Sequence, residues 1–179
     1  MKHKGFTLVE LLMTITIAII LGTVVFVSYS GKKNGTDLSS TTQEIVTLLH
    51  EAQSRTIAGD QNGTTGNGFW GVQFTNATNT TNTAPYYLLF YATSTAGLAT
   101  ANTIGHYPLP PTISYTTSSI AAGGTLSVYY SSPPGVYEVC SGYTCPAGTS
   151  TIVVGLLLPF QKPILSSTIL IAPTGEVSY

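Results

Sequence analysis

The sequence predicts an α+β fold in which a long N-terminal helix packs on an antiparallel β-sheet head. Three observations support this prediction. Residues 6–27 form an apolar run with a single charge, Glu10; an amphipathic segment follows; and beyond Asp60 the pattern changes to short strand-like runs separated by proline, glycine and asparagine. The 179 residues suffice for one domain with a modest core plus an appendage.

The apolar run is long enough to cross a membrane. As a helix it would span roughly 33 Å, whereas a bilayer core is about 30 Å thick. Lys2 and Lys4 precede it and Lys32 and Lys33 follow it, so the lysine count does not orient the helix. A secretory signal peptide is the alternative, but it would need a shorter apolar region and a small-residue cleavage site, which residues 31–35 do not offer.

Residues 31–59 are expected to form the amphipathic helix of the head. Thr36 or Asp37 can cap this helix and Gly59 can end it. We expect Gly31 and Gly35 to kink or interrupt the path between the two helices. Apolar residues recur at near-helical spacing and predict one buried face: Leu38, Ile45, Leu48, Leu49, Ala52 and Ile57.

The remaining chain, residues 60–179, is expected to be β-rich. The candidate strands are rich in β-branched or aromatic residues and are bounded by turn-forming residues. They cover residues 69–74, 86–91, 112–115, 126–130, 136–139, 151–158, 167–172 and 176–179. Pro173, Thr174 and Gly175 are predicted to form a turn into the last of them.

The composition favours a neutral polar surface. There are only six basic and seven acidic residues, which suits an extracellular or periplasmic head better than a nucleic-acid binder. Cys140 and Cys145 fit an oxidising compartment, and we expect them to form a disulfide across a short loop, the alternative being two unpaired thiols.

The sequence shows no catalytic or metal-binding pattern. His3, His50 and His106 are far apart and lie in unlike contexts, and no G-x-S-x-G elbow is present. We therefore expect no enzymatic activity, no metal site and no cofactor. The many tyrosines could stack on ligands, but they are better explained as residues that cover the faces of a sheet.

Residues 4–12 read KGFTLVELL, and this segment resembles the type IV prepilin signature almost residue for residue. The resemblance implies a leader at residues 1–5, cleavage between Gly5 and Phe6 by a membrane aspartyl prepilin peptidase, and N-methylation of Phe6. It also implies that residues 6–30 form a transmembrane and assembly helix. Glycine before the cut has no side chain to obstruct the protease.

Glu10 is the one charge in the apolar run. A carboxylate within a membrane span is costly and usually has a partner. In pilins, that partner is the free amine of a neighbouring subunit's first residue, so the resemblance assigns Glu10 to assembly. The alternative is a carboxylate that is merely tolerated near the bilayer surface.

Residues 48–58, 68–74 and 169–179 resemble the corresponding parts of H-type pseudopilins and related minor pilins. The resemblance implies a structural subunit, either a minor pilin or a pseudopilin, of a type IV pilus or a type II secretion pseudopilus. Its partners would be other pilin subunits, the prepilin peptidase and the inner-membrane assembly platform. The chain would cross the cytoplasmic membrane once, with its head outside the cytoplasm, before joining a filament.

Two other functions remain open. The first is a minor pilin at a filament tip that binds or adheres, including DNA uptake. Loss of Lys2 and Lys4 with the leader takes the six basic residues to four, so little charge is left for phosphate contacts and no nucleic-acid partner is expected. The second is an anchored protein that never polymerises. Major pilins, minor pilins and pseudopilins share the leader, so the sequence does not separate them.

Overall fold

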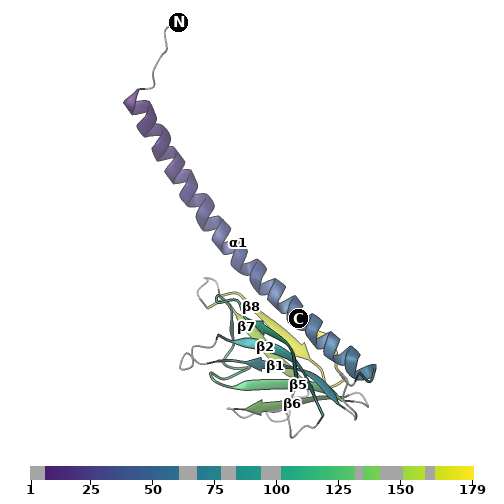
Figure 1. Ribbon diagram of the computed structural model, residues 1–179. Coiled ribbons are helices and arrows are strands. Elements are labelled where there is room, and N and C mark those ends of the chain that lie inside the picture. The colour runs from purple at the N-terminus through teal and green to yellow at the C-terminus, as the bar shows by residue number, and fades with distance from the viewer. Residues whose placement is uncertain are drawn as a thin grey trace. The chain divides into compact units, whose positions relative to one another are not determined.

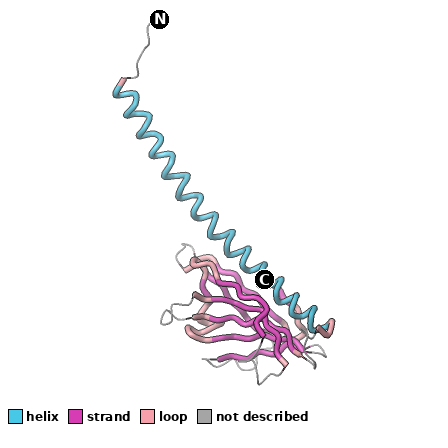
Figure 2. Tube along the Cα trace, in the orientation of Figure 1, coloured by secondary structure: helices cyan, strands magenta, loops and turns pink. Residues whose placement is uncertain are grey.

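The computed structural model describes residues 7–60, 68–77, 84–93, 102–131, 135–141, 151–159 and 164–179 (Figures 1 and 2). One helix, α1 (Leu8–Ile57), precedes the strands. The chain divides into two compact units, one up to Thr36 and the other from Asp37 to Tyr179, so that α1 contributes to both. The second unit holds every strand and is called the head below.

The helix α1 continues through Gly31 and Gly35, so the interruption predicted there is wrong. A glycine inside a helix costs only about 1 kcal/mol relative to alanine, which the helical hydrogen bonds on either side can offset. Thr36 is not a cap, because its hydroxyl donates a 3.1 Å hydrogen bond to the Lys32 carbonyl one turn back.

The end of α1 is fixed by Gly59, as predicted. Gly59 has φ of 69°, a left-handed conformation that glycine adopts without a Cβ penalty. Its N–H donates to the Thr56 carbonyl at 3.1 Å, and the Asp60 N–H donates to the Arg55 carbonyl at 3.0 Å. This pair of bonds is the Schellman arrangement, which satisfies carbonyls that the helix leaves without partners.

Five strands form one antiparallel sheet in the order β3-β2-β1-β5-β6. The strands are β1 (Phe69–Thr75), β2 (Tyr86–Ala92), β3 (Asn102–Pro108), β5 (Thr125–Ser131) and β6 (Gly135–Ser141). In β1, Trp70 lies between Tyr91 of β2 and Tyr130 of β5, and every second residue then faces the same side.

A second antiparallel sheet has the order β4-β7-β8-β9. Its strands are β4 (Ser114–Tyr115), β7 (Ile152–Leu157), β8 (Ser166–Ile171) and β9 (Val177–Ser178). The predicted turn into the last strand is present: the Gly175 N–H donates to the Ala172 carbonyl at 2.8 Å, and Gly175 has φ of 91°.

One hydrophobic core joins the head's part of α1 to both sheets. The helix contributes an apolar face over about four turns, from Leu38 to Ala52, as its periodicity predicted, whereas Ile57 at the helix end is exposed. The largest buried side chains come from the sheets. The core residues of α1 are Leu38, Ile45, Val46, Leu48, Leu49 and Ala52, and the largest sheet residues with them include Trp70, Phe74, Tyr87, Tyr91, Leu156 and Ile169.

The fold confirms the α+β class and, besides the uninterrupted α1, departs from the predicted elements in two respects. The predicted strand ranges each overlap an observed strand, but β3 was not predicted. The head also holds two sheets rather than one. A strand order depends on which residues meet across the head, which periodicity along the chain does not record.

Candidate functional site

The helix start positions Glu10. Thr7 caps α1: its side-chain Oγ1 accepts a 3.3 Å hydrogen bond from the Glu10 N–H, and its carbonyl accepts from Glu10 and Leu11 at 3.1 and 3.2 Å. Thr7-x-x-Glu10 is therefore the spacing of a capping box, in which a threonine and a glutamate close the first turn. A carboxylate here is also favoured by the positive end of the helix dipole. Gly5 and Phe6 lie outside the described residues.

The segment Leu8–Phe26 of α1 is long and apolar enough to cross a membrane. A buried core helix of a soluble protein can pass the same test, but none of this segment is buried against the protein. Its large apolar side chains are between half and four-fifths exposed, which in water would be unfavourable over so many residues. A membrane or the interior of an assembly removes that cost.

The threonines of this segment carry polar groups that are already satisfied. The Thr14 hydroxyl donates to the Leu11 carbonyl at 2.8 Å and the Thr23 hydroxyl to the Ile20 carbonyl at 2.8 Å. Thr16 donates to the Leu12 carbonyl, also at 2.8 Å. Such bonds let a hydroxyl enter an apolar medium without an unpaired donor.

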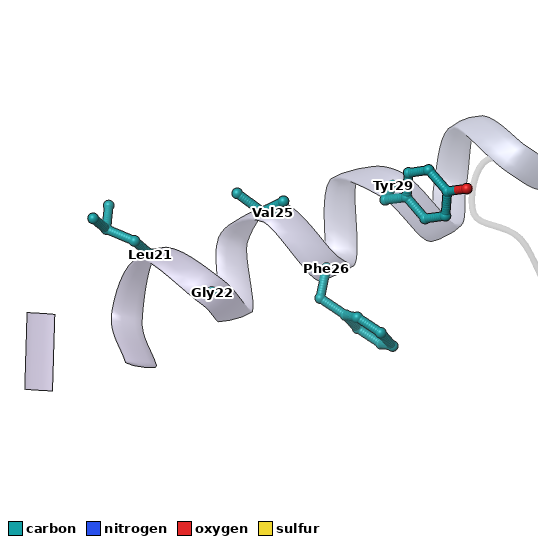
Figure 3. Close-up of a pocket in the computed structure, with 5 residues that line it drawn as sticks. All are labelled: Leu21, Gly22, Val25, Phe26 and Tyr29. Atoms are coloured by element: carbon teal, nitrogen blue, oxygen red, sulfur yellow. The ribbon is translucent and has the colours of Figure 1, made fainter. Parts of the chain in front are cut away.

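A shallow apolar groove lies on α1 at Gly22. Figure 3 shows Leu21 and Val25 rising on one side of Gly22 and Phe26 on the other, with Tyr29 one turn further along. A Cβ added at Gly22 would meet nothing within 4 Å, so the groove exists because this position has no side chain. The sequence does not indicate this groove, since a glycine in an apolar run gives no sign of its neighbours' rotamers.

At the other end of α1, Arg55 binds the helix to the loop that follows. Its guanidinium forms ion pairs with Glu51 at 2.7 Å and Asp60 at 3.1 Å, and its Cζ lies 4.6 Å from the centre of the Trp70 ring. The Trp70 Nε1–H donates to the Asp60 carbonyl at 2.7 Å. The hydrogen bond with Glu51 raises the pKa of Arg55. Because these groups are about a third exposed, the ion pairs contribute little stability and mainly fix the geometry.

The buried tyrosines are core residues, as the sequence suggested. Desolvation raises the pKa of Tyr87 above its usual range, and a hydrogen bond with Glu44 adds to this effect. Desolvation also raises the pKa of Tyr115 and of Tyr130. Tyr87 stacks on Tyr107 with ring centres 5.4 Å apart, inside the head.

The predicted disulfide between Cys140 and Cys145 stays a prediction, and the histidines lie in separate places. Cys140 lies in β6, where its backbone pairs with Leu126, but its side chain and Cys145 lie outside the described residues. His50 is exposed on α1, and the His106 ring packs 4.6 Å from that of Tyr86. Across the described ranges, no group of three or more histidine, cysteine, aspartate or glutamate side chains could hold a metal ion.

Comparison with known families identifies the N-terminal segment. Residues 1–26 match the model of the prokaryotic N-terminal methylation motif, a region that includes Gly5, Phe6, Glu10 and the membrane-length segment of α1. Neither the curated proteins nor the solved structures gave a match to the chain. The N-terminal part of this chain is therefore a type IV pilin-like prepilin leader joined to an apolar helix.

Proposed function

We propose that this chain is a structural subunit, a minor pilin or pseudopilin, of a type IV pilus or a type II secretion pseudopilus. The observation that carries the proposal is the match of residues 1–26 to the methylation motif, on a helix segment with no buried residue. A chain of this kind is anchored in a membrane by its apolar helix and then assembles with other subunits through the same helix.

Processing is the first step of the proposed function. A prepilin peptidase cuts between Gly5 and Phe6, and Phe6 then receives a methyl group on its new amine. The cut removes Lys2 and Lys4 and leaves a helix whose first capped turn begins at Thr7. The charged residues nearest the new terminus are then its own amine and Glu10.

Glu10 is proposed to set the axial register of neighbouring subunits. Glu10 lies four positions after Phe6, which would be about 6 Å along a helix. At that spacing, the amine and the carboxylate of one chain are poorly placed to pair with each other. A neighbour shifted by about one turn brings its own Phe6 amine alongside Glu10, where a charge-assisted hydrogen bond offsets the desolvation of both groups.

The head is proposed to lie outside the cytoplasm. Its only described ion pairs join Arg55 to Glu51 and Asp60, and its cohesion comes from an apolar core rather than from charge. The resemblance of residues 48–58, 68–74 and 169–179 to H-type pseudopilins and related minor pilins is the reason for proposing a minor pilin or pseudopilin, although the leader is shared with major pilins. The assembly platform of the inner membrane and the other pilin subunits are the proposed partners.

The state of the N-terminus tests this function. Full-length protein is expressed with its prepilin peptidase and assembly system, and intact mass is measured separately on the membrane fraction and on filaments sheared from the cell surface. We expect both to hold a chain that begins at a methylated Phe6. A chain that begins at Met1, or that is cut near residues 28–35, contradicts the proposal. A correctly cut chain that never enters any filament leaves only the anchored protein.

A further inference from the structure

The groove at Gly22 and the two lysines that follow the membrane segment share one face of α1. At 100° per residue, positions 22, 25, 26, 29, 32 and 33 lie within an arc of about 120°. Val25, Phe26 and Tyr29 line the groove, and their side chains are roughly 70% exposed. Lys32 and Lys33 are exposed about one turn beyond Tyr29. An apolar groove and a pair of cations therefore follow one another along the same face of α1.

In a bilayer, this face would place the groove in the apolar core and the two lysines near the headgroups. If Leu8–Phe26 fills the apolar core, Lys32 lies about 9 Å beyond its edge, close to the headgroup layer, which is roughly 5–8 Å thick. Side chains on a helix tilt toward its N-terminus, which here is the membrane, and a lysine stem can extend further in that direction. Tyr29 lies between the two levels, where an amphipathic ring is favoured.

We propose that this face binds an anionic phospholipid in the membrane-anchored chain. One acyl chain lies in the groove over Gly22, and the phosphate is held by Lys32 and Lys33. Within the residues that the structure describes, both ion pairs involve Arg55, and neither lysine forms one. The next charged residue, Asp37, is one turn further from the membrane, so a phosphate at the headgroup level meets the lysines first. The proposal does not require filament formation.

A second copy of α1 is the other possible occupant of the groove. Two copies that pack on this face without an axial shift would bring their Lys32 and Lys33 pairs to the same level, where like charges repel. A lipid phosphate instead supplies the opposite charge. With the one-turn shift proposed for the filament, Asp37 of one copy would be level with Lys33 of the next, so the repulsion excludes only the unshifted pair. The lipid is therefore proposed as the occupant in the anchored chain, before it assembles.

The proposed site is tested by measuring which phospholipid associates with the chain. The full-length chain, with Lys2 and Lys4 changed to glutamine in every sample, is reconstituted into phosphatidylcholine bilayers. A trace of spin-labelled phosphatidylglycerol or spin-labelled phosphatidylcholine is added, and the motionally restricted fraction of each label is measured. We expect a several-fold preference for phosphatidylglycerol. Each of Lys32→Gln and Lys33→Gln should lower it, by up to about fivefold, and the double change should bring it near one. The double arginine variant should retain it.

The groove is tested with two variants that each place a leucine on α1, one in the groove and one on the opposite face. Gly22→Leu fills the groove and should lower phosphatidylglycerol association, whereas Val24→Leu adds bulk on the opposite face and should not. Salt at 1 M should reduce the preference, because the screening length falls to about 3 Å.

Equal association of the two labelled lipids with the wild type overturns the proposal, as does a preference that survives in the double glutamine variant. If Gly22→Leu and Val24→Leu change phosphatidylglycerol association equally, the groove is not part of the lipid site. If Gly22→Leu alters cross-linking between copies of α1 but leaves lipid association unchanged, the occupant is a second copy, and the proposal is wrong. None of these readouts depends on filament assembly, so the proposed function stands or fails separately.

Discussion

Glu10→Gln separates the charge of Glu10 from its place in the helix. Position 10 is the third residue after the Thr7 cap, where glutamine serves a capping box as well as glutamate does. The variant therefore retains the helix start and removes only the charge. We expect cleavage and the folding of the head to be unchanged, and incorporation into filaments to fall.

The size of the effect follows from the pairing with the neighbour's amine. A hydrogen bond to a charged group contributes about 1.5–3 kcal/mol, which corresponds to roughly a 10- to 150-fold change in the association of one subunit with the next. The cost of holding a carboxylate in the membrane, at most about 2.5–3.5 kcal/mol at its centre, works in the opposite direction and is removed in the variant. Membrane insertion of Glu10→Gln should consequently be at least as efficient as that of the wild type.

The assay compares Glu10→Gln with wild type and with Thr7→Ala at equal expression. Thr7→Ala removes the capping oxygen at a cost of about 1 kcal/mol but retains the carboxylate. Cleavage is measured by intact mass, and incorporation by quantifying the chain in sheared filaments. Wild-type incorporation of Glu10→Gln would refute the register mechanism. Equal losses in Glu10→Gln and Thr7→Ala would show that the helix start, and not the charge, is what assembly requires.

Four further predictions concern the head, prepared as a soluble fragment from about residue 31. Gly71→Ala should lower the free energy of unfolding, measured in urea, by about 3 kcal/mol. The Cβ of the new alanine would meet the Val128 carbonyl oxygen and lie 2.7 Å from the Phe90 ring. An effect below about 1 kcal/mol would mean that β1 and β5 separate easily. Burial raises the pKa of Tyr87, Tyr115 and Tyr130, so the unfolded chain loses these protons first as the pH rises. The free energy of unfolding should therefore fall above about pH 10, by up to about 1.4 kcal/mol per pH unit for each of these tyrosines. A flat profile between pH 9 and 11 in urea titrations would contradict this. Cys140 and Cys145 should be unreactive toward a thiol reagent in the denatured, unreduced protein, since we expect a disulfide that contributes about 2 kcal/mol; labelling of both would rule it out. The fragment should bind duplex DNA negligibly at physiological salt, and salt-sensitive binding at sub-micromolar concentration in a fluorescence titration would show that the sparse positive charge is misleading.

The sequence predicted those elements whose signals are local. The apolar run, the buried face of α1 and the cap at Gly59 depend on residues within a few turns of one another, and the structure has all three. Most strands were found because prolines and glycines bound them. The interruption at Gly31 and Gly35 was wrong because a weak local preference yields to a helix that continues on both sides.

The elements that were missed depend on contacts across the head. The strand β3 contains Gly105 and ends at Pro108, so its own residues argue against a strand, and it forms by pairing with β2 at the edge of the sheet. The ring of Trp70 over Arg55 joins residues from two elements, which no spacing along the chain indicates. Of the candidate site, the sequence identified Glu10 through its motif, but not the groove at Gly22, which depends on how neighbouring side chains are arranged.

The threonine hydroxyls of the membrane-length segment bear on how a subunit leaves one apolar environment for another. Thr14, Thr16 and Thr23 donate to carbonyls of their own helix, and those bonds travel with the chain wherever it goes. In the proposed assembly, transfer from lipid into a filament would therefore exchange no hydrogen bonds at these three positions. Glu10, by contrast, would change its partner in that transfer, so the proposed preference for the filament over the membrane would come from the first turn of the helix and not from the threonines.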